Sequence, residues 1–275
     1  MAEYPRNDLL VEPEWLAEHQ DDPAVRIVDA RGAPRYAEGH IKNAVNLAVA
    51  RLDDPTAPVR STLLPAERFA TVAGGAGIGS RHTVVVYDDG PGLMATRVFW
   101  ALEYYGHENV KVLNGGIARW MAEAREVVST PTTVEPAEFQ PQPRPERGAT
   151  KQEVAERLGK ADTVLLDVRS KDEYTGAVSQ ALRGGHIPGA KWRDWSDSLQ
   201  MGGVPVLKDA AELQKGFQGT GATPDKEVIT YCQGGIRAAH SYYVLRLLGY
   251  DKVRNYTGSW GDWGNDPSLP AEQGD

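Results

Sequence analysis

The feature that most constrains this chain is that its second half repeats the motifs of its first half in the same order. Each half has an apolar run ending in Asp-x-Arg, then a tyrosine, then a Gly-His-Ile motif. A second apolar run, a helical pattern and a third apolar run follow. The matching motifs are Asp29-Ala30-Arg31 with Asp167-Val168-Arg169, Tyr36 with Tyr174, Gly39-His40-Ile41 with Gly185-His186-Ile187, and Asn114-Gly115-Gly116 with Thr257-Gly258-Ser259. We interpret the chain as two copies of one domain.

Within each copy, short β-branched runs alternate with helical patterns, which predicts an α/β fold with a parallel sheet flanked by helices. Buried parallel strands are expected at residues 25–28, 84–87, 163–166 and 228–231. Helices are expected at residues 65–73, 96–105, 151–158 and 238–248. Thr150 and Glu153 are spaced as a capping box for the third of these helices.

A proline-rich stretch separates the two copies, with Pro131, Pro136, Pro141, Pro143 and Pro145. Proline interrupts both helix interiors and central strands, so this stretch is expected to be an extended tether. The sequence therefore predicts an N-terminal unit at residues 1–130, a linker at 131–148 and a C-terminal unit at 149–275.

Composition excludes several classes of function. The formal charge of −8 and the absence of a basic stripe argue against a nucleic-acid partner. No apolar stretch is long enough to cross a bilayer, and Met1 to Arg6 lacks the features of a signal peptide. Cytoplasmic localisation is therefore expected. One cysteine and six scattered histidines lack metal-ligand spacing, so neither a metal nor another cofactor is expected.

The single cysteine, Cys232, lies between an apolar run and a helical pattern, in the segment Tyr231-Cys232-Gln233-Gly234-Gly235-Ile236-Arg237. A free cysteine is mostly protonated at neutral pH, but the N–H groups at a helix N-terminus favour its thiolate. Gly234 and Gly235 allow successive N–H groups to turn inward, and Arg237 can hold an oxyanion. The alternative is a buried structural thiol, which does not need two glycines and an arginine within five residues.

These motifs resemble the rhodaneses, the sulfurtransferases that use thiosulfate or 3-mercaptopyruvate. The resemblance rests on Asp-x-Arg, His186-Ile187-Pro188-Gly189-Ala190, the Cys232–Arg237 loop and Gly258-Ser259-Trp260, and it covers nearly the whole chain. It implies that Cys232 takes a sulfur atom from a small anionic donor and passes it, as a persulfide, to cyanide or a thiol. Gln233, Gly234, Gly235 and Ile236 would then surround the persulfide.

The first copy has Asp88 where the second has Cys232, followed by Asp89 and Pro91. A carboxylate cannot carry sulfane sulfur, two carboxylates repel an anionic donor, and proline removes one amide. The first copy is therefore expected to be a non-catalytic scaffold that covers the active cleft.

Other candidate residues have competing interpretations. Asp167 and Arg169 recur in the first copy, which favours a structural ion pair, with Arg169 lying near the loop. Arg183 lies in an insert found only in the second copy, so it is either a substrate contact or a solvated charge. Some rhodaneses carry an arginine where this chain has Glu173, so that anion contact is absent or replaced.

Three rival functions remain open. A cysteine phosphatase shares this architecture but has one more residue between cysteine and arginine than the four found here. A persulfide carrier would use the same thiol to deliver sulfur to a protein partner. A 3-mercaptopyruvate sulfurtransferase is expected to have a hydroxyl in the loop; because this loop has none and is cationic, thiosulfate is the preferred donor.

Overall fold

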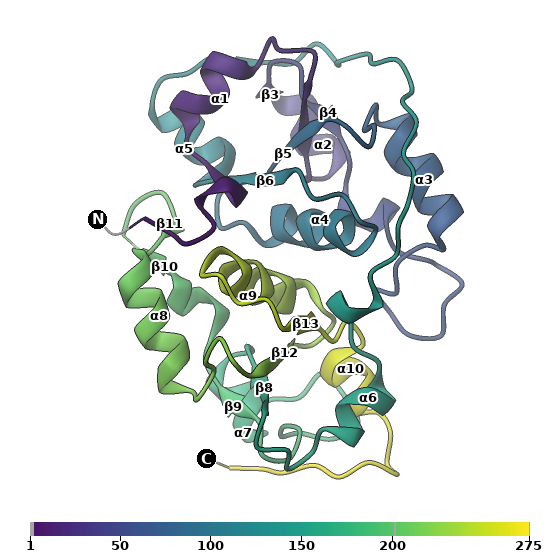
Figure 1. Cartoon of the computed structure of the whole chain (residues 1–275), viewed down its shortest axis with the longest axis vertical. Helices are drawn as coiled ribbons and strands as arrows, with labels where there is room; N and C mark the ends of the chain where they lie inside the picture. The colour runs from purple at the N-terminus through teal and green to yellow at the C-terminus, as the bar shows by residue number, and fades with distance from the viewer. Residues whose placement is uncertain (1–2, 201, 275) are drawn as a thin grey trace.

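The computed structural model describes residues 3–200 and 202–274 (Figure 1). The first repeat contains a five-stranded parallel sheet in the order β1-β6-β5-β2-β4, and the second contains a four-stranded parallel sheet in the order β13-β12-β8-β9. The expected parallel α/β architecture is confirmed in both repeats.

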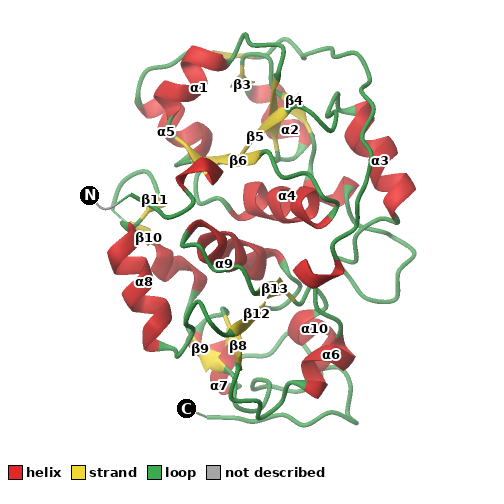
Figure 2. Cartoon of the chain, viewed as in Figure 1, coloured by secondary structure: helices red, strands yellow, loops and turns green. Residues whose placement is uncertain are grey.

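The elements of the first repeat are β1 (Leu10–Val11), α1 (Pro13–His19), β2 (Val25–Asp29), α2 (Ala33–Glu38), β3 (His40–Ile41), β4 (Val45–Asn46), α3 (Ala66–Gly75), β5 (Thr83–Tyr87), α4 (Leu93–Tyr104), β6 (Val110–Leu113), α5 (Gly116–Ala122) and β7 (Val127–Val128). Those of the second are α6 (Lys151–Glu156), β8 (Thr163–Asp167), α7 (Lys171–Thr175), β9 (Lys191–Trp192), β10 (Leu199–Gln200), β11 (Val206–Leu207), α8 (Ala210–Gly219), β12 (Glu227–Tyr231), α9 (Ile236–Leu247), β13 (Val253–Asn255) and α10 (Ser259–Trp263). Figure 2 shows that loops join most of these short elements.

Helices cover both faces of each sheet because alternate strand residues point to opposite sides. In β5, Val84 and Val86 join one apolar cluster with α3 and α4, whereas Val85 and Tyr87 join another with α1 and α5. In the second repeat, α8 and α9 lie on one face, and α6 and α10 lie on the other.

The two repeats meet through α4 and α9, which lie side by side in the middle of the molecule (Figure 1). One apolar cluster runs from the first sheet through these two helices to the second sheet. Every residue from Ala95 to Glu103 and from Ala238 to Leu247 is buried, so polar groups on both helices are also held out of water. This interface determines what surrounds the end of β12, where Cys232 lies.

The proline-rich stretch is extended, as expected, but it is fixed to the first repeat and is not a loose tether. The amide of Ala137 donates to the Gly74 carbonyl at 3.0 Å, and that of Gln142 donates to the Tyr105 carbonyl at 2.9 Å. Phe139 is buried against Phe69. The apolar anchor at Phe139, among the prolines, explains why the segment packs.

Among the described residues, no helix combines the length and the apolar character that crossing a membrane requires. Thr150 and Glu153 form the expected capping box at the start of α6, with both reciprocal hydrogen bonds present.

Candidate active site

Cys232 follows the last residue of β12 and lies four residues before the start of the first full turn of α9, with 2% of its surface exposed. Gly235 is the N-cap of α9 and has φ of +82°. A Cβ atom at Gly235 would lie 2.9 Å from the Cα of Thr257, so only glycine fits this turn. Gly234, in contrast, has no positive φ, so only one of the two glycines supplies the left-handed conformation.

Hydrogen bonds hold the cysteine from both sides. The amide of Gly235 donates to Sγ of Cys232 at 3.1 Å. The amide of Cys232 donates to Oγ of Ser259 at 3.0 Å, and its carbonyl accepts from the amide of Trp260 at 2.9 Å. The thiol is therefore fixed between the N-terminal ends of α9 and α10, where backbone N–H groups are concentrated.

The first repeat shows what such a loop can bind. The buried carboxylate of Asp88 accepts hydrogen bonds from four amides of its own loop and helix, at 2.9 to 3.3 Å: Gly90, Gly92, Met94 and Ala95. Burial raises the pKa of Asp88, while these amides act in the opposite direction. The loop of the first repeat is therefore occupied by its own carboxyl group, in addition to lacking a thiol.

The two loops can be aligned at their N-cap glycines, because Gly92 has φ of +85° and Gly235 has φ of +82°. The amide of Gly92 bonds Asp88 as that of Gly235 bonds Cys232. In this alignment the amides of Arg237 and Ala238 correspond to those of Met94 and Ala95, which bind the second carboxylate oxygen of Asp88. If the second loop binds an anion in the same way, the amides of Arg237 and Ala238 are the donors for its second atom.

Arg237 projects from the first turn of α9 and pairs with Glu173 of α7. Its Nη1 and Nη2 atoms donate to the two carboxylate oxygens at 2.7 and 2.9 Å. Burial lowers the pKa of Arg237, but Glu173 and the charge at Cys232 outweigh burial and raise it. Burial alone would raise the pKa of Glu173, but the hydrogen bond and charge of Arg237 and the hydrogen bonds from Ser170 together lower it to about 2. At the position where some rhodaneses carry an arginine that contacts the anion, this chain therefore has a carboxylate that orients Arg237.

The guanidinium of Arg183 forms hydrogen bonds with the backbone of the C-terminal segment. Its nitrogen atoms donate to the backbone carbonyls of four C-terminal residues: Trp263, Gly264, Asp266 and Leu269. These bonds fix the segment after α10, so we leave Arg183 out of the proposed site.

Asp167 and Arg169 form a buried pair that the first repeat reproduces. Nη2 of Arg169 lies 2.5 Å from Asp167 and 2.7 Å from the Gly185 carbonyl. Arg31 makes the same contacts with Asp29 and the Gly39 carbonyl. The same geometry in a repeat without the cysteine supports the structural interpretation.

The first repeat also contributes residues that sequence reasoning missed. Arg97 on α4 is fully buried; its Nη2 donates to Asp53 and to the Ser61 carbonyl, while Nε and Nη1 have no partner within the described residues. Burial lowers its pKa, and Asp53 and the charge at Cys232 act against burial. An arginine within the mostly apolar run from Ala95 to Leu102 was the available signal in the sequence.

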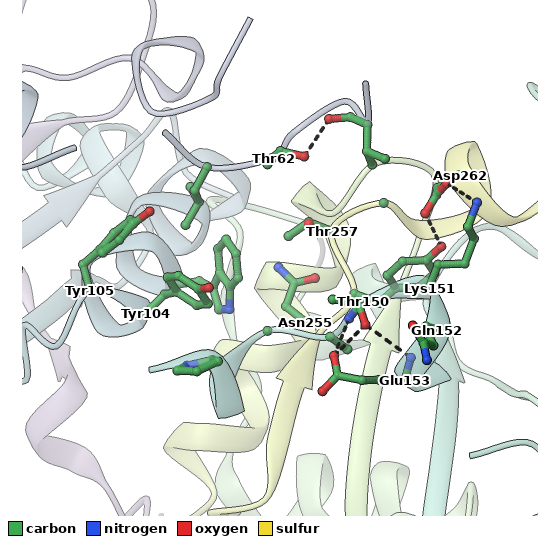
Figure 3. Close-up of a pocket in the computed structure, with 18 residues that line it drawn as sticks. Thr62, Tyr104, Tyr105, Thr150, Lys151, Gln152, Glu153, Asn255, Thr257 and Asp262 are labelled. Carbon is green, nitrogen blue, oxygen red and sulfur yellow. Dashed lines mark hydrogen bonds and ion pairs between the residues drawn. The ribbon is translucent and has the colours of Figure 1, made fainter. Parts of the chain in front are cut away.

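Two adjoining cavities lie along the interface between the repeats. One, of about 800 Å³, is lined by residues 58–61 of the first repeat and by Gln233, Gly234 and Ile236 beside Cys232. The other, of about 460 Å³, shares Val59, Lys151 and Asp262 with it. Figure 3 shows the second cavity, with Tyr104 and Tyr105 on one side and the first turn of α6 on the other.

Within the part of the chain that the structure describes, no group of three or more His, Cys, Asp or Glu side chains could hold a metal ion. The site consists of a thiol, backbone amides and paired charges, which suits nucleophilic attack by sulfur on an anionic substrate.

Comparisons with known proteins agree with this geometry. The rhodanese-like domain model matches twice, at residues 12–123 and 150–266. A protein of Pseudomonas aeruginosa named thiosulfate sulfurtransferase is 38% identical over 96% of this chain and 97% of its own length. The sulfur carrier protein TtuD of Thermus thermophilus is 35% identical over 99% of both chains. The solved structure of SseA from Escherichia coli, described as a 3-mercaptopyruvate sulfotransferase, is 32% identical with a TM-score of 0.83, over 92% of this chain and 98% of that one.

Proposed function

This chain belongs to the rhodanese family, and we propose that it is a sulfurtransferase that takes sulfane sulfur from thiosulfate and carries it as a persulfide on Cys232. The observation that carries this proposal is the thiol at the end of β12, held by the Gly235 amide on Sγ at the N-terminal end of α9.

In the first step, the Cys232 thiolate attacks the outer sulfur of thiosulfate. A new S–S bond forms, the bond between the two thiosulfate sulfurs breaks, and sulfite leaves with the electron pair. In the second step, cyanide or a thiolate attacks the outer sulfur of the persulfide, which releases thiocyanate or a new persulfide and restores the thiolate. Charge is conserved in both steps, and the protein needs no cofactor for either.

The loop has a role in each step. The amides of Arg237 and Ala238 stabilise the outer sulfur as charge moves onto it, in the way that Met94 and Ala95 hold the second oxygen of Asp88. Gly235 turns its amide onto Sγ, and Gln233, Gly234 and Ile236 form the edge of the 800 Å³ cavity through which donor and acceptor approach. Arg237 compensates the charge of the dianionic donor.

Thiosulfate is the proposed donor because the loop between Cys232 and Arg237 has a cation at its end and contains no hydroxyl. The resemblance to a thiosulfate sulfurtransferase of Pseudomonas aeruginosa supports this choice. The similarity to TtuD, named a sulfur carrier protein, favours one second candidate: delivery of the persulfide to a protein acceptor.

The test is thiocyanate formation from cyanide with either donor. We expect a higher kcat/KM with thiosulfate than with 3-mercaptopyruvate, and no transfer by Cys232→Ser. Arg237→Ala should lower kcat/KM by about ten- to a thousandfold, because one or two charge-assisted bonds are lost. Arg35→Ala is the control, since Arg35 is exposed far from the loop in sequence and pairs only at the surface.

A higher kcat/KM with 3-mercaptopyruvate would reassign the donor. Aryl-phosphate hydrolysis without thiocyanate would refute sulfur transfer altogether. Slow turnover with small acceptors that becomes rapid with a protein acceptor would favour the carrier function.

A further inference from the structure

Ser259, beside Cys232, has a backbone conformation that serine rarely adopts. Its φ is +54°, in the left-handed region that favours glycine, and its side chain is completely buried. Three other non-glycine residues among those described have positive φ, namely Asn43, Ser61 and Ala124, and none of them is buried. Strained residues inside a protein persist where the surroundings or the function require them.

The first repeat shows what the fold alone requires at this position. The amides of Ile117 and Ala118 donate to the carbonyls of Asp88 and Asp89, as those of Trp260 and Gly261 donate to Cys232 and Gln233. This register makes Gly116 the counterpart of Ser259, and Gly116 has φ of +53°.

Glycine is therefore the residue at this turn in the repeat without the cysteine. A Cβ atom at Gly116 would lie 2.4 Å from the carbonyl oxygen of Asp88, so a side chain is excluded there. In the second repeat, the loop after β12 accommodates a side chain at the same φ. The fold does not need a serine at this position. The presence of Ser259 therefore points to a role for its hydroxyl group.

The hydroxyl of Ser259 contacts the cysteine at two points. Its Oγ accepts a hydrogen bond from the Cys232 amide at 3.0 Å and lies 4.0 Å from Sγ of Cys232. The single hydroxyl proton is donated to the carbonyl of Tyr256 at 2.7 Å. Oγ thus anchors the backbone of Cys232 while the Gly235 amide holds Sγ, and a rotation about one bond would turn the hydroxyl proton toward the sulfur.

We propose that Ser259 is a positioning residue for Cys232, retained in a left-handed conformation because its hydroxyl fixes the cysteine so that Sγ faces the amides of the loop. The inference rests on the proposed role of Cys232 as the sulfur-carrying residue. Without the hydroxyl, the buried Cys232 amide has no partner, and the orientation of the thiol relative to Gly235 is no longer fixed.

Among the described residues, the charged groups that act on Cys232, directly or through a partner, include Arg237 on α9, its partner Glu173 on α7, and Arg97 on α4. Substitution of Ser259 leaves all three in place. A change in the pH dependence of the thiol would therefore report on the hydroxyl and not on a lost charge.

The test compares Ser259→Gly with Ala124→Gly. Both substitutions remove a side chain from a left-handed residue, at φ of +54° and +56°, but Ala124 is exposed and lies in the other repeat. Ser259→Ala adds a variant that keeps Cβ and loses only the hydroxyl. Since Cys232 is the only cysteine, the rate of alkylation by iodoacetamide measured against pH reports on it alone.

For Ser259→Gly and Ser259→Ala we expect folded proteins whose alkylation midpoint lies about half to one pH unit higher, because the thiolate loses alignment with its donors. We expect kcat for thiocyanate formation to fall about three- to tenfold with little change in KM for thiosulfate. Ala124→Gly should match the wild-type protein in the alkylation profile and in kcat.

The proposal is overturned if both Ser259 variants fold and keep the wild-type alkylation profile and kcat. It is also overturned if neither variant folds, because the serine would then be a structural requirement. If the wild-type protein forms no thiocyanate, the proposed function fails, but the alkylation profiles still decide whether Ser259 positions the thiol.

Discussion

At the scale of single residues, one position separates the two repeats: Cys232 in the second and Asp88 in the first. The sequence predicted the cysteine, the left-handed glycine and the arginine, because these lie within six consecutive positions. It did not predict that Glu173 pairs with Arg237, that Arg183 bonds four carbonyls, or that Ser259 holds the Cys232 amide. Each of these contacts joins residues at least 27 positions apart, and a local pattern carries no information about such contacts.

The pair of Glu173 and Arg237 predicts a specific dependence of stability on pH. The folded-state pKa of Glu173, about 2, is below its ordinary value, so its ionised form stabilises the fold above about pH 4.5. This contribution, ~3 kcal/mol at its upper limit, is lost as the pH falls from about 4.5 toward 2. Glu173→Gln should therefore be less stable than wild type at pH 7 and should differ from it less at pH 3, as measured by urea unfolding at each pH.

Glu146→Gln serves as the control, because the Glu146 carboxylate is exposed and forms no ion pair with another described residue. Stability–pH curves that run parallel for Glu173→Gln and the wild-type protein would contradict a folded-state pKa this low.

At the scale of elements, the alternation of strands and helices was predictable and their ends were not. Residues 228–231 were expected as a strand and β12 is Glu227–Tyr231, because period and β-branching mark a buried strand. The helix expected at 238–248 begins two residues earlier, at Ile236, since Gly235 provides the cap. Nothing in local periodicity indicated that α4 and α9 bury all their sides, which follows from each helix packing between its own sheet and the other repeat.

Burial of α4 and α9 places an ion pair inside the interface. Glu103 of α4 accepts hydrogen bonds from Arg246 at 3.0 Å and from the Tyr242 hydroxyl at 2.5 Å, both on α9. Glu103→Ala leaves Arg246 buried without this partner, so we expect a loss of about 3 kcal/mol in the free energy of unfolding. The measurement is urea unfolding followed by circular dichroism.

The double variant Glu103→Leu/Arg246→Met tests the reason for that loss. Since it removes both charges, we expect it to be more stable than Glu103→Ala. If the two variants were equally destabilised, lost packing rather than an unpaired charge would explain the effect.

At the scale of the whole molecule, the two repeats share one core and are not independent domains. Phe99 of α4 contacts Tyr243 of α9 edge to face, and Tyr243 donates to the carbonyl of Leu9 near the N-terminus. The repeated motifs predicted the two units, but the shared core depends on apolar faces whose partners lie more than a hundred residues away.

The shared core predicts that residues 149–275 alone will not form a stable catalytic unit. Separated from α4, the apolar face of α9 would be exposed to water. We expect this fragment to bind a hydrophobic dye, to lack a cooperative thermal transition and to form no thiocyanate. A sharp thermal transition with wild-type turnover would show that the second repeat is self-sufficient.

The packing of α4 against α9 also bears on how the protein is made. On the ribosome, α4 is complete at Tyr104, whereas α9 ends only at Leu247. At translation rates of ~5–20 residues per second, the nascent first repeat waits roughly seven to thirty seconds for its partner helix. During that interval the apolar side of α4 that will pack on α9 is exposed to chaperones and to neighbouring nascent chains. The yield of active enzyme should therefore respond to elongation speed.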